Sequence, residues 1–132
     1  MTITKHFDDQ DVGLKSTGYR SQAIVTPEGF IFVAGQIGAD PQSKELVSPG
    51  MREQTLRCLE NVEMVMKAAG GTRDDLVQLH VYITDEEVYP EFDQATREFF
   101  GGRPPTRSVV GSSFLAAGAL VEISGIGYIG NR

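Results

Sequence analysis

The sequence predicts an α+β fold in which two helices pack on one face of a mixed sheet. Apolar residues alternate with polar ones in several short runs, which is typical of strands, and they recur every three or four residues in two longer runs, which is typical of helices. The order of these runs is ββαβαββ. Strands that precede and follow a crossover helix can lie parallel, so the order indicates a mixed sheet. No linker or repeat divides the 132 residues, and we expect a single domain over 1–132.

The first two strands are expected to form a hairpin. The β-rich runs SQAIVT (21–26) and FIFVAGQI (30–37) are separated by Pro27-Glu28-Gly29, a spacing that favours a turn. A polar loop follows the second run. Near its end, Ser48 is a plausible N-cap and Pro49 suits the first turn of a helix.

The first helix is predicted from Met51 to the glycine pair Gly70-Gly71. Cys58 and Val65 lie beside its apolar face. The positions that recur at helical spacing are Met51, Thr55, Leu59, Val62, Met66 and Ala69.

The second half of the chain repeats this alternation of strand and helix. LVQLHVYI (76–83) alternates as a strand does, Pro90 opens a second helix, and Gly101-Gly102 end it. Two further strands are expected in TRSVVGSSFL (106–115) and ALVEISGIGYIG (119–130), around a turn at Ala117-Gly118. The side of the second helix expected to be buried carries Phe92, Ala95, Thr96 and Phe99.

Two helices cover only one face of such a sheet. The other face would expose Ile, Val and Leu side chains over a large area, and large apolar patches usually mean association. We therefore expect an oligomer that uses the uncovered face.

The charge balance makes several classes of partner unlikely. The chain carries 12 basic and 18 acidic residues, a formal net charge of −6, and no basic stripe that would bind nucleic acid or an anionic membrane. No run of apolar residues is long enough to span a bilayer. The first residues lack the apolar stretch of a secretory signal, and one cysteine cannot form an intrachain disulfide, so we expect a cytoplasmic protein.

Arg107 is the first candidate for chemistry. It stands between Pro104-Pro105 and a run that favours a strand, where a rigid loop enters the core. A guanidinium fixed in this way can hold a carboxylate by two parallel hydrogen bonds. The alternative is a salt bridge within or between chains.

Glu122 is the second candidate. It lies in a strand that is otherwise almost free of charge, on the same face as Leu120, Ser124 and Ile126. A partly buried glutamate with a partner can accept a proton from water as a general base. Alternatively, it is solvated at an edge.

Other polar side chains give weaker signals. Cys58 lies on an apolar helix face and is expected in the core. His6 and His80 have no second ligand at metal spacing, so we expect no metal site.

These motifs resemble the RidA family of small trimeric proteins along nearly the whole chain. The matching stretches are FIFVAGQIG, QTLRCLENVEMVMKAAGG, VYITD, FDQATREFF, PPTRSVV and VEISGIG. The glycine-bearing motifs and the arginine of the PxRS pattern are specific when they occur in this order.

The resemblance implies a chorismate-mutase-like homotrimer with clefts between subunits, and a small carboxylate substrate. It also implies an enamine/imine deaminase that hydrolyses 2-aminoacrylate-type intermediates to 2-keto acids and ammonia without a cofactor. The family arginine matches Arg107, which would bind the substrate carboxylate, and the family glutamate matches Glu122, which would orient the attacking water. The residues that would line the cleft are Gly35, Gln36, Ser108 and Val109.

Three departures from the family pattern bear on the substrate. Tyr19-Arg20 stands where the family often has proline and a cleft tyrosine, Ala34 replaces a serine, and Asp93 replaces an asparagine. A second guanidinium near Arg107 would favour a dicarboxylate, such as a muconate-type enamine. Alternatively, Arg20 pairs with Asp93 or another acid and fills the cleft.

The alternative to an enzyme is a non-catalytic trimer that binds a small carboxylate and reports metabolic state to a partner. Both functions need Arg107, and only the enzyme needs Glu122.

Overall fold

The computed structural model of the chain describes residues 3–15, 18–48 and 50–130. The predicted order ββαβαββ runs from β2 to β6, and β1 and α1 precede it. Short 3₁₀ turns lie at Arg73–Asp75, Glu86–Val88 and Ala116–Gly118. The strands are β1 (Lys5–Phe7), β2 (Ala23–Val25), β3 (Phe30–Ile37), β4 (Leu76–Ile83), β5 (Thr106–Gly111) and β6 (Val121–Tyr128), and the helices are α1 (Asp9–Val12), α2 (Met51–Ala68) and α3 (Tyr89–Phe100).

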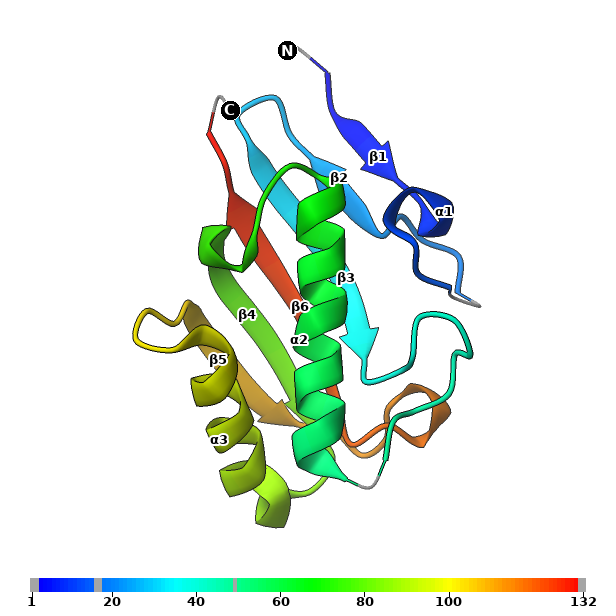
Figure 1. Cartoon of the computed structure of the whole chain (residues 1–132), viewed down its shortest axis with the longest axis vertical. Helices are drawn as coiled ribbons and strands as arrows, with labels where there is room; N and C mark the ends of the chain where they lie inside the picture. Colours follow the sequence, from blue (N-terminus) through cyan, green and yellow to red (C-terminus); the bar gives the residue numbers. More distant parts are fainter. Residues whose placement is uncertain (1–2, 16–17, 49, 131–132) are drawn as a thin grey trace.

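The six strands form one mixed sheet in the order β1-β2-β3-β6-β4-β5 (Figure 1). Strands β4 and β5 are parallel, and the other neighbouring pairs are antiparallel. Since β3 and β4 both run antiparallel to β6, they are parallel to each other, and α2 connects them. Helix α3 connects β4 to β5. Each long helix therefore joins two parallel strands, as predicted.

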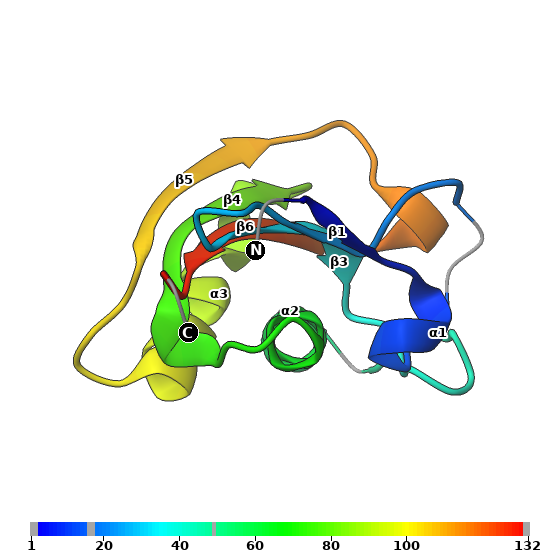
Figure 2. The same ribbon diagram turned by 90° about the horizontal axis from the view of Figure 1, so that it is seen from above.

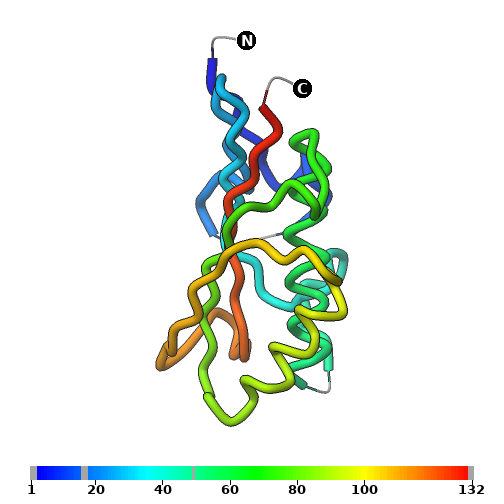
Figure 3. Tube along the Cα trace, turned by 90° about the vertical axis from the view of Figure 1, so that its left-hand side faces the viewer, coloured from blue at the N-terminus to red at the C-terminus, as the bar shows by residue number. Residues whose placement is uncertain are grey.

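Both long helices pack on the same face of the curved sheet (Figure 2). Seen from the side, the strands and the helices form two layers (Figure 3). The expected α+β arrangement is confirmed. Within the described residues, no helix is both long enough and apolar enough to cross a membrane.

Helix α2 supplies much of the core. Its predicted apolar face is buried, with Leu59, Val62 and Met66 fully inaccessible to solvent. The expected N-cap at Ser48 is wrong: Gly50 is the N-cap, and its N–H donates to Oε1 of Glu53 at 3.2 Å. The Glu53 carboxylate in the first helical turn thus accepts the N–H of the N-cap residue, which has no side chain of its own to cap the helix. Pro49 lies outside the described residues.

Strand β1 and helix α1 have no predicted counterpart. Strand β1 pairs with β2 by only three residues, with Lys5 opposite Val25, and no apolar alternation identifies it. Helix α1 is one turn long, and Asp8 and Asp11 each accept the other's backbone N–H. Val12 is buried at its end. Such short elements depend on packing more than on their own sequence pattern.

The face opposite the helices carries exposed rings. Strand alternation places Phe30 and Phe32 of β3 there, with Tyr82 of β4 and Tyr128 of β6. The exposed fraction of these four residues lies between 38% and 47%. The sequence predicts aliphatic side chains on this face. The exposed large side chains of this face include these four rings and Val110 of β5.

Candidate functional site

Arg107 is the second residue of β5, directly after the rigid Pro104-Pro105 loop, as predicted. In the β4–β5 ladder it stands beside Leu79, which is buried under the helices, so its side chain lies on the helix side of the sheet. Its Nη1 donates to Oγ1 of Thr96 at 3.2 Å. Its Nη2 donates to the Tyr89 hydroxyl at 2.8 Å and to Oδ1 of Asp93 at 2.7 Å. Helix α3 therefore fixes the guanidinium.

Asp93 lies between two arginines. Oδ1 accepts from Arg107, and Oδ2 accepts from Nε of Arg97 at 2.9 Å. The hydrogen bond from Arg107, followed by that from Arg97, holds the pKa of Asp93 below its usual value. The carboxylate is therefore ionised at neutral pH, and its side chain keeps 25% of its surface exposed.

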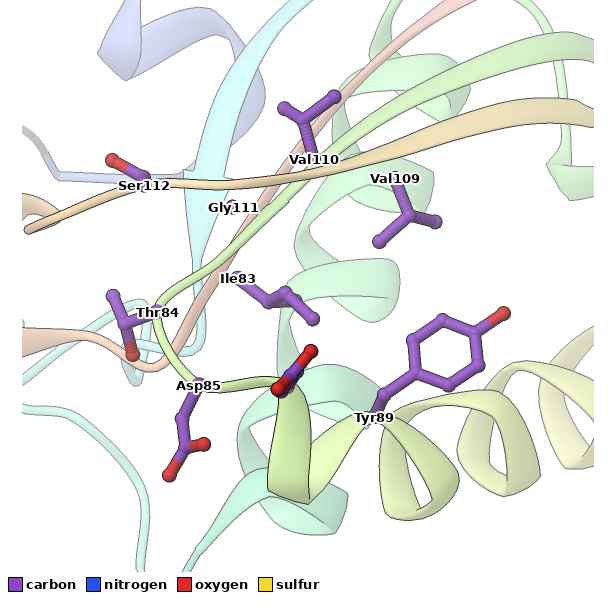
Figure 4. A pocket seen from close by; sticks show the side chains of 9 residues that line it. Ile83, Thr84, Asp85, Tyr89, Val109, Val110, Gly111 and Ser112 are labelled. Atoms are coloured by element: carbon purple, nitrogen blue, oxygen red, sulfur yellow. The ribbon is translucent and has the colours of Figure 1, made fainter.

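Two pockets lie beside α3 and β5. Arg107, Asp93 and Arg97 line one of about 410 Å³, which the 101–105 loop borders. A second, of about 610 Å³, lies between the end of β5 and the start of α3. Figure 4 shows Val109 pointing toward Tyr89 in this second pocket, and Val110 pointing away from it. Ser108 alternates to the other side of β5, opposite His80 in the ladder.

Glu122 lies in a different pocket, of about 530 Å³. Three other predicted residues line the same pocket: Arg20, Gly35 and Gln36. Gly35 is next to Glu122, because a Cβ atom at position 35 would lie 2.7 Å from Oε2 of the glutamate. The pairing register of β3 and β6 shifts between Val33 and Gln36, so a strand irregularity brings the two together. The pocket also contains Lys15, Asp40 and Lys44.

Gln36 belongs to a buried chain of amides that the sequence analysis missed. Its Nε2 donates to Oε1 of Gln22 at 2.7 Å, and Nε2 of Gln22 donates to Oδ1 of Asp9 at 2.7 Å. The backbone carbonyl of Gln36 accepts from Sγ of Cys58. The amide of Gln36 therefore ties β3 to β2 and α1. These hydrogen bonds hold the strand segment beside Glu122.

Arg107 and Glu122 do not meet within one chain. Glu122 shares a ladder row with Tyr82 and Val110, which face away from the helices. Arg107 lies three positions earlier along β5 and faces the helices. Arg20 lines the pocket of Glu122, whereas Asp93 is bound by Arg107 and Arg97 in the other pocket. A site that contains both Arg107 and Glu122 therefore needs a second copy of the chain.

The weaker candidates, Cys58 and His6, each hydrogen-bond to another part of the chain. Cys58 is fully buried, as predicted, and burial strongly raises the pKa of its thiol, with a smaller contribution from Glu122. Nδ1 of His6 lies 3.1 Å from the Ser21 hydroxyl. Within the described ranges, no three His, Cys, Asp or Glu side chains are grouped so that they could hold a metal ion.

Tyr89, Thr96 and Arg97 are the polar residues near Arg107 and Asp93 that the sequence analysis did not connect with a site. Helical spacing was the available signal. Tyr89, Asp93 and Thr96 are separated by four and three residues, which places them on one face of α3.

Comparisons with known proteins agree with this fold. The family profile described as Endoribonuclease L-PSP matches residues 13–129. A RutC family protein of Pyrococcus abyssi is 38% identical over 114 residues, which cover 86% of this chain and 89% of that protein. A 2-iminobutanoate/2-iminopropanoate deaminase of Dermatophagoides farinae is 30% identical over 109 residues, 83% and 84% of the two chains. The crystal structure of RidA from Psychrobacter sp. PAMC 21119 superposes with a TM-score of 0.83 at 31% identity, covering 90% of this chain and 95% of that one.

Proposed function

The chain belongs to the RidA family, and we propose from this premise that it hydrolyses reactive enamines and imines of the 2-aminoacrylate type to 2-keto acids and ammonia. The relative named as an imine deaminase supports such chemistry at the level of the family. One observation carries the proposal: the guanidinium of Arg107 is fixed by three side chains of α3 at the entrance of β5. Of its five N–H groups, two donate to none of the described residues and are available to a ligand.

The proposed reaction needs orientation and one proton acceptor. An enamine first tautomerises to the imine, whose carbon is electrophilic. Arg107 would hold the substrate carboxylate, and Glu122 would accept a proton from water as the oxygen bonds to the imine carbon. That proton would pass to the nitrogen to give a carbinolamine. Its hydroxyl proton would then pass through Glu122 to the same nitrogen as the C–N bond breaks, which releases ammonia and leaves the keto group. Orienting the water beside the imine would lower the barrier by several kcal/mol, about the order expected for positioned reactants.

We propose further that the protein is a homotrimer and that Arg107 of one chain faces Glu122 of the next. The separation of these residues within one chain supports this arrangement, because each chain would contribute one half of a site to each neighbour. The exposed rings of Phe30, Phe32 and Tyr82 offer an apolar face for the contact. Cyclic symmetry would then give three equivalent sites.

The cations near Glu122 favour a dicarboxylic substrate. Lys15, Arg20 and Lys44 line this pocket together with two acids, Asp40 and Glu122. The excess of one positive charge would suit a second carboxylate. Alternatively, Arg20 only fills the pocket. Ammonia release from mono- and dicarboxylic enamines, compared between the wild type and Arg20→Tyr, separates these cases, and equal selectivity in both proteins would remove the dicarboxylate proposal.

Two other functions make different predictions. A carboxylate-binding regulatory trimer would need Arg107 but would tolerate the loss of Glu122. The family profile carries the name of an endoribonuclease. The formal net charge of −6 argues against RNA as the main ligand.

A coupled assay tests the proposed activity. An amino-acid oxidase or a serine/threonine dehydratase generates the imine or enamine in solution, and ammonia and keto acid are measured with and without this protein. We expect both products to form faster with the protein than by spontaneous hydrolysis. Equal rates would contradict an enzymatic function.

A further inference from the structure

Arg107 already holds a carboxylate of its own chain. Nη2 of Arg107 lies 2.7 Å from Oδ1 of Asp93, and the two side chains keep 27% and 25% of their surface exposed. Both line the same pocket of about 410 Å³. Any carboxylate that binds Arg107 there would therefore have the negative charge of Asp93 as a close neighbour.

This ion pair differs from the structural one nearby. Arg73 binds both oxygens of Glu63, at 2.9 and 2.7 Å, and donates to the backbone carbonyl of Phe99. Its guanidinium also stacks on the Phe99 ring, 3.7 Å from the centroid, and only 12% of the Glu63 side chain is exposed. Asp93 is twice as exposed and lines a pocket, so a ligand can reach it.

We propose that Asp93 makes the Arg107 site selective for ligands that carry an N–H donor next to their carboxylate, and selective against plain carboxylates. The inference rests on the proposed function, because it assigns Arg107 to the substrate carboxylate. The selected class is that of 2-iminium and 2-amino carboxylates, which are zwitterions. In the site, the cation Arg107 would face the carboxylate of such a ligand, and the anion Asp93 would face its nitrogen.

This selectivity would arise from charge. A plain carboxylate at Arg107 would bring two anions to one guanidinium. Arg97, which also donates to Asp93, offsets part of this repulsion, but 74% of its side chain is exposed, so solvent screens its charge. A zwitterion places its own cationic nitrogen beside its carboxylate, where Asp93 can accept the N–H. Each carboxylate oxygen of Asp93 accepts one hydrogen bond from the described residues, which leaves lone pairs for this contact.

The same selectivity would help product release. Hydrolysis replaces the C=N–H group of the substrate by a C=O group, so the 2-keto acid product has no N–H to offer Asp93. The product would then meet the repulsion of Asp93 without the compensating hydrogen bond. Asp93 would thereby distinguish substrate from product at the same carboxylate clamp.

Equilibrium binding of stable analogues tests the inference. Alanine represents the zwitterion, and pyruvate represents the plain carboxylate. Calorimetric titration of the wild type should give alanine an affinity about tenfold higher than pyruvate, in line with the cost of placing like charges together. Asp93→Asn should tighten pyruvate about fivefold and weaken alanine, so that the preference is lost or reversed. Glu91→Gln removes a charge from an exposed position of the same helix and should leave the preference unchanged.

The outcomes are separable from those of the activity assay. Equal affinities for alanine and pyruvate in the wild type, or no alanine binding at millimolar concentration, would overturn the inference without recourse to any variant. An unchanged preference in Asp93→Asn, with ammonia release intact in the wild type, would overturn it while leaving the proposed function standing. The expected preference in a protein that releases no ammonia would support the inference and contradict the deaminase.

Discussion

The carboxylate of Glu122 occupies the space that a side chain at Gly35 would need, since a Cβ atom there would lie 2.7 Å from Oε2. No real Cβ atom tolerates such a distance, so position 35 has to be glycine while the glutamate keeps this conformation. The atom that this Cβ would meet belongs to the flexible end of the Glu122 side chain and not to the backbone. A methyl group at position 35 would therefore displace the carboxylate rather than disrupt the strand.

Gly35→Ala should consequently reduce ammonia release at least tenfold, because a misplaced general base loses much of an acceleration of roughly 10²–10⁴. The free energy of unfolding should change by less than about 1 kcal/mol. Gly38→Ala is the matched control, because its Cβ would lie 2.5 Å from the backbone oxygen of Gln54. That variant should lose stability instead. A fully active Gly35→Ala protein would show that the position of the Glu122 carboxylate does not matter.

Arg107→Lys should lose the activity although it keeps the charge. An ammonium has three N–H groups and cannot bond to Thr96, Tyr89 and Asp93 and still offer N–H donors to a ligand. We expect kcat/KM to fall by about a hundredfold, as for the loss of one charge-assisted hydrogen-bond pair. Circular dichroism should show an unchanged fold. A lysine variant with near wild-type kcat/KM would mean that Arg107 acts only as a point charge.

The Arg107–Asp93 pair should make stability depend on pH. The pKa of Asp93 is lowered in the folded chain by Arg107 and Arg97, so its stabilising effect is complete above the unfolded-state value and is lost as the pH falls through the folded one. Urea unfolding should find the wild type more stable than Asp93→Asn by about 1 kcal/mol between pH 5 and 8. This difference should shrink below about pH 4. A difference that stays constant down to pH 2 would contradict the ion pair.

Phe32→Asp should prevent the proposed assembly. Phe32 lies on the uncovered face of β3 with 46% of its surface exposed, and a charge there would have to be buried in a contact between chains. Light scattering should report a trimer for the wild type and a monomer for the variant. Gln94→Asp adds the same charge to an exposed position of α3 and should remain trimeric. Trimers of Phe32→Asp would exclude this part of the face from the contact.

The sequence predicted the long elements well, because each has its own periodicity. The apolar positions of α2 and α3 identify their buried faces, and the alternation of β4 and β6 identifies theirs. The one-turn helix α1 and the three-residue strand β1 have no such signal. The helix starts at Gly50 instead of Ser48, and the preference of serine for N-cap positions favoured the wrong residue because glycine has no side chain to signal a cap.

The candidate site was only partly predictable for a related reason. Strand alternation indicates that Glu122 and its neighbour Val121 point to opposite faces of the sheet. The two prolines before Arg107 indicate that a rigid loop precedes it. Whether two strands bring these residues together depends on strand order, and β4 lies between β5 and β6. The partnership of Asp93 with Arg107 links a helix to a strand by tertiary packing, so it was likewise invisible in the sequence.

The central claim is that Arg107 of one chain and Glu122 of another form one site, and subunit mixing tests it most directly. Arg107→Ala and Glu122→Gln are each expected to be inactive alone. When equal amounts are refolded together, about a quarter of the sites in a randomly mixed cyclic trimer would combine an intact arginine with an intact glutamate. We therefore predict recovery of about a quarter of the wild-type ammonia release, on the same symmetry argument. A mixture that forms trimers and stays inactive would contradict a site shared between chains.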